Sequence, residues 1–331
     1  MNIRQQTEQF ERETLAPDAC LAVNSRGRKI EEEPCEFRTC FQRDRDRIIH
    51  SKAFRRLKHK TQVFLAPEGD HYRTRLTHTL EVSQIARSIA RGMRLNEDLA
   101  EAAALGHDLG HTPFGHAGER ALNSVSQCGF KHYEQSARTA QKFERNGRGL
   151  NLTYEVENAI LCHTDAIADT LEGRIIEIAD KIAYINHDID DAIHAGIITN
   201  DDLPHEALEL LGKTTSKRIS TLISAIVTDE SRQIKMPADV RGAFDMLHSY
   251  MFEAVYSNPV AKSEEGKAQD IIKYLYSYFL SNPEKLPSQF LRIADEEGLD
   301  RAVCDHIASM SDNFAIRFYE ELVIPKSWSV L

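Results

Sequence analysis

Proline and glycine are scarce in this chain, at 10 and 16 of its 331 positions. So few turn-forming residues argue against a fold of many short strands and against a largely disordered chain. The sequence also lacks the strand–helix alternation of a parallel sheet, any internal repeat and any low-complexity tract. What recurs instead are amphipathic segments whose apolar residues stand three and four positions apart. The sequence therefore predicts an all-α fold.

Cysteine motifs for zinc ribbons and redox centres are absent as well. The six cysteines are scattered, and no two of them have the C-x-x-C spacing. No apolar run is long enough to cross a membrane, and residues 1–16 lack the apolar stretch of a signal peptide. We therefore expect a cytoplasmic protein with reduced thiols and no membrane contact.

The net charge of −10 disfavours non-specific binding to nucleic acid as the main role. Residues 41–60 depart from this average, because they carry eight Lys or Arg against two acids, Asp44 and Asp46. One interpretation is a solvated helix whose basic side chains form salt bridges, and the other is a face that binds a polyphosphate. On the second interpretation, a nucleotide effector or single-stranded nucleic acid stays open as a partner.

The clearest helical pattern begins at Thr77, where apolar residues follow the helical period as far as Met93. Another helix is expected over 43–59, with Ile48, Ile49, Phe54 and Leu57 facing inward. Further helices are expected over 8–15, 95–109, 132–145, 154–163, 172–194, 204–228, 239–257, 266–281, 286–297 and 299–309. The expected organisation is an N-terminal arm over 1–40, a core over 41–200 and a C-terminal helical region over 201–331 packed on the core.

The first chemical signal is a dispersed set of histidines and aspartates. His107 and Asp108 stand side by side at the end of an alanine-rich helix, His78 begins the preceding helix, and Asp180 lies inside a later one. Two imidazoles and two carboxylates can bind Mn, Mg, Fe, Ni or Zn and leave positions open for water and phosphate. A His–Asp dipeptide alone is more often a capping or surface pair, so the surrounding residues decide.

The helix over 171–195 has two contrasting faces. Five isoleucines lie along one face, whereas Asp180, Tyr184, His187 and Asp191 lie almost opposite, with Asp188 close by. The spacing alone does not decide between two interpretations: the polar face is exposed to water, or it lines a cleft. For His187 and Asp191 we expect solvent exposure.

The segment from His107 to Glu119 is the densest in titratable groups. It holds three histidines, one Asp and one Glu within thirteen residues, separated by three glycines and a proline. Buried histidines each need hydrogen-bond partners, so a protein core rarely contains such a segment. The composition favours a catalytic loop.

Four segments together resemble the bacterial deoxyguanosine-triphosphate triphosphohydrolases and their dGTPase-like relatives. They are Phe41–Phe64, Arg73–Val82, His107–Glu119 and Ala179–Asp191. They carry the H…HD…D pattern of the HD superfamily, and the resemblance covers roughly residues 1–200. It implies an HD-domain helical bundle with a C-terminal helical extension. It also implies metal-dependent hydrolysis of a deoxynucleoside triphosphate (dGTP or several dNTPs) to deoxynucleoside and inorganic triphosphate, commonly by a homo-oligomer.

The resemblance assigns site residues position by position. One divalent metal ion would be held by His78, His107, Asp108 and Asp180. The catalytic group would comprise His116 beside the scissile phosphate, Glu119 that orients it, and His111 and His132 facing the triphosphate. Arg75 and Lys181 would bind phosphate, and Gln62, Tyr184 and Asp188 would hold the deoxyribose.

Two alternatives stay open. With His132 and His163 added, the ligand order also fits the six-ligand pattern of two-metal HD phosphodiesterases or nucleotidases that act on another nucleotide. His163, however, follows the apolar residues 160–162 in a helix, and this position favours a core histidine over a second metal ligand. The other alternative is a nucleotide-sensing or nucleic-acid-binding HD protein that has lost turnover. An intact ligand set with His116 and Glu119 argues against that loss.

Overall fold

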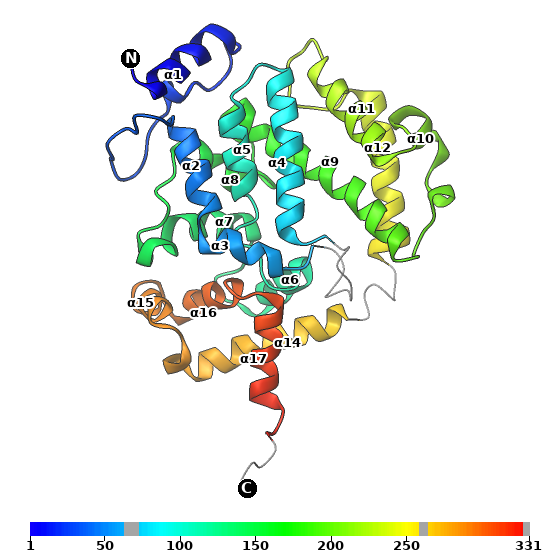
Figure 1. Ribbon diagram of the computed structural model, residues 1–331. Coiled ribbons are helices and arrows are strands. Elements are labelled where there is room, and N and C mark those ends of the chain that lie inside the picture. The colour runs from blue at the N-terminus through cyan, green and yellow to red at the C-terminus, as the bar shows by residue number, and fades with distance from the viewer. Residues whose placement is uncertain (63–72, 258–263, 327–331) are drawn as a thin grey trace.

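The computed structural model describes residues 1–62, 73–257 and 264–326 (Figure 1). Across these ranges the regular elements are helices, and the only strand-like pairings are the isolated bridges Arg28–Thr153 and Thr61–Thr74. None of the helices in this part of the chain has the length and apolar character needed to cross a membrane. The predicted all-α fold is confirmed.

The centre of the molecule is formed by α4 (Arg75–Gly92), α5 (Glu97–Gly106), α8 (Tyr154–Cys162) and α9 (Leu171–His194). Alanines of α5 are fully buried, and their small side chains let α4 and α9 approach it closely. Isoleucines of α4 and α9 fill the rest of this core. Since α4, α5 and α9 carry His78, His107 and Asp180, the packing of this core decides where the polar cluster lies.

The N-terminal part comprises α1 (Ile3–Thr14), η1 (Ala22–Asn24), α2 (Cys40–Ile49), α3 (Lys52–Arg56) and η2 (Leu57–His59). The prediction of one helix over 43–59 is wrong. The chain breaks after Ile49 because Ser51 caps α3, with its Oγ accepting a hydrogen bond from the Phe54 N–H at 3.0 Å. Ile49 is consequently 38% exposed instead of facing inward, whereas Ile48, Phe54 and Leu57 are buried as expected.

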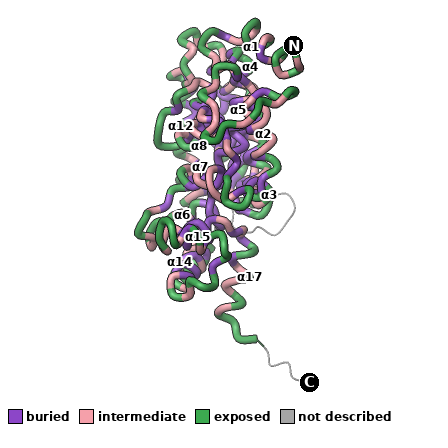
Figure 2. Tube along the Cα trace, turned by 90° about the vertical axis from the view of Figure 1, so that its left-hand side faces the viewer, coloured by how far each residue is buried: buried purple, intermediate pink, exposed green. Residues whose placement is uncertain are grey.

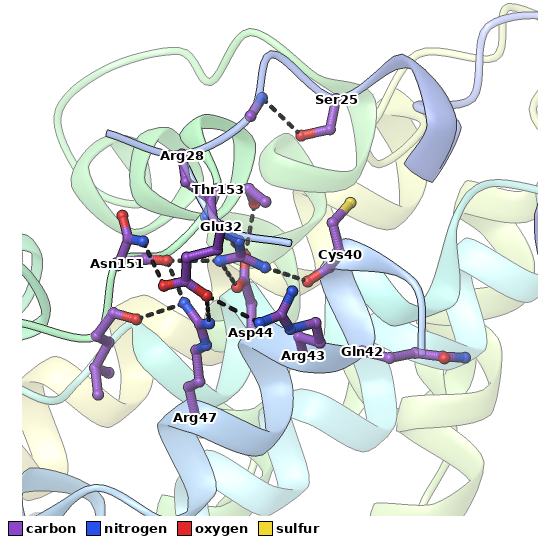
Figure 3. A network of polar contacts seen from close by, with 12 residues as sticks. Ser25, Arg28, Glu32, Cys40, Gln42, Arg43, Asp44, Arg47, Asn151 and Thr153 are labelled. Atoms are coloured by element: carbon purple, nitrogen blue, oxygen red, sulfur yellow. Dashed lines mark hydrogen bonds and ion pairs between the residues drawn. The ribbon is translucent and has the colours of Figure 1, made fainter. Parts of the chain in front are cut away.

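Figure 3 shows that arginines of the basic segment are engaged in ion pairs. Glu32 accepts from Arg43 at 2.9 Å and from Arg47, while Arg45 lies 3.3 Å from Glu101. Asp44, one of the two acids, is fully buried between Arg28 and Thr153, whose N–H it accepts at 2.8 Å. For these arginines, the salt-bridged interpretation is the one that agrees with the structure. The network ties the N-terminal segment to α2.

Past α9 and η4 (Asn200–Asp202), a first group of helices packs on α9 and α4. It consists of α10 (His205–Leu211), α11 (Thr215–Val227), α12 (Ala238–Met251) and a π-helical turn over Phe252–Tyr256. The single helix expected over 204–228 is two helices, because the chain turns at Gly212 with φ +113°, a backbone conformation that disfavours other residues.

A second group of helices lies at the opposite end of the molecule (Figure 1). It consists of α14 (Glu265–Ser281), η6 (Pro283–Lys285), α15 (Ser288–Glu297), α16 (Leu299–Ala308) and α17 (Asp312–Val323). These helices share a hydrophobic cluster with Phe114, Leu122 and Phe130, which belong to or flank α6 (Gly115–Val125). After α6 come α7 (His132–Lys142) and η3 (Arg145–Gly147). Helix α17, which the sequence did not predict, extends outward with few buried residues (Figure 2).

Candidate functional site

The four proposed metal ligands converge from three helices. His78 lies near the start of α4, His107 and Asp108 at the end of α5, and Asp180 in α9. The Oδ1 of Asp180 lies 2.9 Å from His78 Nε2 and 3.9 Å from His107 Nε2, and Asp108 Oδ1 lies 3.5 Å from His107 Nε2. The structure therefore gathers His78, His107 and Asp108 in one cluster and places the Asp180 carboxylate beside its two imidazoles.

The local backbone turns His107 toward this point. Its Nδ1 lies 2.6 Å from the carbonyl oxygen of Ala104 and donates to it, which leaves Nε2 as the acceptor. That Nε2 is buried, and no described residue gives it a hydrogen bond. A buried acceptor without a partner is costly, and a divalent cation would satisfy it. The donor set therefore fits a divalent metal ion.

Arg75 adds positive charge beside the ligands. Its Nη1 lies 2.7 Å from Asp108 Oδ2. Burial opposes ionisation of Asp108, but neighbouring positive charge, including that of Arg75, holds its pKa well below the ordinary value. The Nε and Nη2 of Arg75 are buried and have no partner among the described residues, which suits them to bind an anion. Gly115 leaves room for this guanidinium, since a Cβ there would lie 3.2 Å from Nη2.

A second polar group, formed by His111, His116, Glu119 and His132, adjoins the first. Glu119 lies 3.0 Å from the Nδ1 of both His116 and His132, and it also accepts the His132 N–H at 2.8 Å. Burial opposes its ionisation, yet these hydrogen bonds hold the pKa of Glu119 far below its usual range. The rings of His111 and His132 stack at 4.4 Å, and His111 links the groups because its Nε2 lies 3.9 Å from Asp108. His116 is exposed, so its imidazole is accessible from outside.

The loop that joins the two groups is held by residues far away in the sequence. Phe114 has φ +63°, which costs about 1–2 kcal/mol for a residue other than glycine. Its ring is buried among the C-terminal helices, and Asp312 of α17 accepts its N–H at 3.0 Å. Asp312 also accepts the N–H of Thr61 at 2.8 Å, and the buried Lys60 Nζ donates to the carbonyls of His111 and Ala308. The roles of Lys60 and Asp312 could not be predicted from the sequence, because no local pattern marks a contact between such distant segments.

The residues expected to hold the sugar form a third cluster. Tyr184 is half-buried and stacks on Tyr256, with ring centroids 5.5 Å apart and planes 15° apart. The Tyr256 hydroxyl donates a hydrogen bond to the buried Asp188. Burial raises the pKa of Asp188 to about 7, although the hydrogen bond from Tyr256 acts to lower that pKa. Gln62 stands next to the Thr61–Thr74 bridge with its Oε1 buried and unpaired within the described ranges. Tyr256 was missed, since nothing in the sequence connects it with Asp188.

Two expectations about α9 need correction. His187 and Asp191 are buried at 6% and 5% exposure, so the prediction that they face solvent is wrong. Arg73 covers this face, with its Nη1 2.6 Å from Asp191, and His187 Nδ1 lies 2.8 Å from Glu81. By contrast, Lys181 is exposed and pairs with Glu177 at 2.6 Å, so the structure does not bring it into the ligand cluster.

His163 is buried beside both polar groups. Its ring centroid lies 5.2 Å from that of His107 and 5.3 Å from that of His132. One ligand atom each of Asp108, His132 and His163 lies within 4.8 Å of the others. Its Nδ1 donates to the Ile160 carbonyl at 2.7 Å, which leaves Nε2 free in the same way as for His107. The position suits a second metal ligand as well as a core histidine.

Comparison with known proteins bears on the same residues. A model of the HD domain matches residues 75–185, and a model of a phosphohydrolase-associated domain matches residues 234–321. Among solved structures, a phosphohydrolase from Bacteroides thetaiotaomicron has a TM-score of 0.52 at 15% identity and covers 81% of this chain and 66% of its own. At that identity the likeness concerns the fold alone.

Full-length relatives are more informative. A deoxyguanosinetriphosphate triphosphohydrolase-like protein of Caldanaerobacter subterraneus subsp. tengcongensis is 52% identical over 99% of this chain and 98% of its own length. One from Desulfatibacillum aliphaticivorans is 47% identical over 98% of this chain and 99% of its own. The chain therefore belongs to the deoxyguanosinetriphosphate triphosphohydrolase-like family of HD-domain phosphohydrolases.

Proposed function

We propose that this protein hydrolyses deoxynucleoside triphosphates, dGTP or several of them, to deoxynucleoside and inorganic triphosphate. One divalent metal ion would be held by His78, His107, Asp108 and Asp180. The observation that carries the proposal is the convergence of these ligands with an arginine whose Nε and Nη2 are buried and unpaired among the described residues. Analysis of the products that purified, metal-loaded protein forms from each dNTP and NTP tests this proposal.

Each group has a physical role in such a reaction. When bound, the metal would polarise a phosphoryl oxygen and lower the pKa of a water molecule. The unpaired N–H groups of Arg75 would neutralise charge that develops on the phosphoryl oxygens. His116, oriented by Glu119, would protonate the departing 5′ oxygen of the nucleoside or position the water. His111 and His132 would face the triphosphate. Lys181 would have to leave Glu177 to reach a phosphate.

The stacked tyrosines give a prediction about sugar selection. We expect Tyr184→Ala to open space beside Asp188 and to lower the dNTP/NTP ratio of kcat/KM by roughly ten-fold. The ratio is measured with purified variant and each nucleotide pair. Tyr274→Ala is the matched control, because that ring packs on Tyr319 in the C-terminal helices. An unchanged ratio in Tyr184→Ala would place the sugar pocket elsewhere.

The support from α17 gives a second prediction. Asp312→Asn preserves the shape of the side chain but removes the charge that the N–H groups of Thr61 and Phe114 share. Since displacement of a catalytic loop by about 1 Å can cost on the order of 10²-fold, we expect kcat to fall roughly 10- to 100-fold with metal content unchanged. Glu320→Gln, at an exposed position of the same helix, is the control. A lower melting temperature with unchanged kcat would mean that Asp312 serves stability alone.

The position of His163 favours one alternative function, a two-metal HD phosphodiesterase or nucleotidase acting on another nucleotide. Metal content separates the two proposals. The alternative requires two metal ions per chain, one of them lost in His163→Ala, whereas the main proposal requires one ion that His163→Ala retains. The homo-oligomer, and a nucleotide effector or single-stranded nucleic acid as partner, stay predictions.

A further inference from the structure

Two cysteines far apart in the sequence lie next to each other beside the segment that leads into α7. Cys128 lies in the segment between α6 and α7, and Cys304 lies in α16. Their sulfur atoms are 3.9 Å apart. Cys128 is exposed and therefore open to a reagent in solution, whereas Cys304 is buried beneath it. Because 176 positions separate them, no local cysteine motif could reveal the pair.

The backbone around Cys128 is fastened to α16. Asp300, near the start of α16, accepts the N–H of Cys128 at 2.8 Å and that of Gln127 at 3.2 Å. The hydroxyl of Tyr276 donates to the same carboxylate. These bonds hold the backbone at Cys128 beside α16. Asp300 is the carboxylate close enough to the two sulfurs to bind a metal ion together with them. Because both of its oxygens already accept hydrogen bonds, a metal ion is disfavoured at this place.

We propose that Cys128 and Cys304 form a reversible disulfide that links the segment leading into α7 to the C-terminal helices. A disulfide has sulfurs about 2.05 Å apart, so the exposed side chain of Cys128 must bring its sulfur closer to that of Cys304 by roughly 2 Å. Intracellular disulfides, where they occur, are commonly transient and redox-sensing. His132 starts α7 four positions after Cys128 and is bound to Glu119, so the link would fasten the entry to a helix of the functional site.

The oxidant is a low-molecular-weight disulfide such as oxidised glutathione. The Cys128 thiolate attacks one of its sulfurs and releases the first glutathione thiolate. The Cys304 sulfur then attacks the mixed disulfide on Cys128 and releases the second. The two protein thiols lose two electrons and two protons, and the reagent becomes two molecules of reduced glutathione. Cys128 is the first nucleophile because it is the exposed sulfur.

Oxidation of the full-length protein with glutathione disulfide tests the proposal. After free thiols are alkylated, peptide mapping is expected to find Cys128 joined to Cys304. The melting temperature should rise by several degrees, because a cross-link over so long a loop restricts the unfolded chain, and dithiothreitol should reverse the rise. Cys304→Ser should trap the glutathione adduct on Cys128 and abolish the rise. Cys35→Ser is the control, because backbone N–H groups lower the pKa of the Cys35 thiol to about 7. This variant should still form the Cys128–Cys304 linked peptide and should still show the rise in melting temperature.

Two outcomes would overturn the proposal. One is a glutathione adduct that persists on wild-type Cys128 without a linked peptide. The other is a zinc ion, added alone, that protects Cys128 and Cys304 from alkylation and stays bound when glutathione disulfide is present. Neither readout depends on hydrolysis of a nucleotide, so a failure of the proposed function would leave this test intact.

Discussion

Asp108→Ala is expected to lose the bound metal ion and to lower kcat by on the order of 10³-fold, since a metal contributes several kcal/mol to such a reaction. Among the four proposed ligands, Asp108 contacts the most partners, with His107, His111 and Arg75 all within 4 Å. Removing its carboxylate takes away one ligand and also leaves a buried guanidinium unpaired. Elemental analysis of the purified variant, alongside single-turnover kinetics, measures both effects.

Two further variants keep this prediction falsifiable. Asp108→Asn retains the volume of the side chain, so it separates loss of metal from loss of fold, which circular dichroism monitors. Asp245→Ala removes a carboxylate exposed on α12 and should retain both metal and activity. Equal metal content in wild type, Asp108→Ala and Asp108→Asn would contradict the assignment of the ligands.

His116→Ala is expected to lower kcat by roughly 10²–10⁴-fold, the usual contribution of a general acid or a water-positioning group. Metal content and nucleotide affinity should change little, because His116 is exposed and lies in α6, outside the cluster of four ligands. His205→Ala, at an exposed histidine of α10, is the control. Near-wild-type turnover in His116→Ala would end the proposal that this residue acts in the chemistry.

The pairing of His116 with Glu119 adds a double-mutant test. If Glu119 works by holding the imidazole, the combined loss in His116→Ala with Glu119→Ala should be smaller than the product of the single losses. Glu119 also binds His132, so Glu119→Ala should keep some effect in the absence of His116. Strictly multiplicative losses would show that Glu119 does not act through His116.

Local patterns in the sequence were enough to predict most helices, but the grouping of His78, His107, Asp108 and Asp180 also needed the resemblance to a family. The helical period places Asp180 on one face of α9, and the resemblance to a family connects it with the other three. Breaks inside long amphipathic runs were harder to foresee. Ser51 begins a helix as its N-cap, and Gly212 ends another helix with a positive φ, and the hydrophobic period reveals neither position.

Outside the four proposed metal ligands, the contacts between distant segments discussed above could not be predicted. His187 and Asp191 are buried because Glu81 contacts His187 and Arg73 contacts Asp191. The hydrogen bond to Asp188 comes from Tyr256, which lies three α-helices further along the chain. Asp312 supports the loop of Phe114 from almost two hundred positions away. Polar side chains like these look solvent-exposed in a sequence, because only the tertiary fold supplies their partners.

The measurement that tests the central claim most directly is product analysis with purified protein, Mn²⁺ and each dNTP and NTP in turn. The proposed function predicts that at least one dNTP, dGTP or another, yields deoxynucleoside and inorganic triphosphate in equal amounts, and that ribonucleotides react poorly. Release of a nucleoside monophosphate with pyrophosphate, release of a diphosphate with phosphate, or no turnover of any dNTP by metal-loaded protein would contradict it.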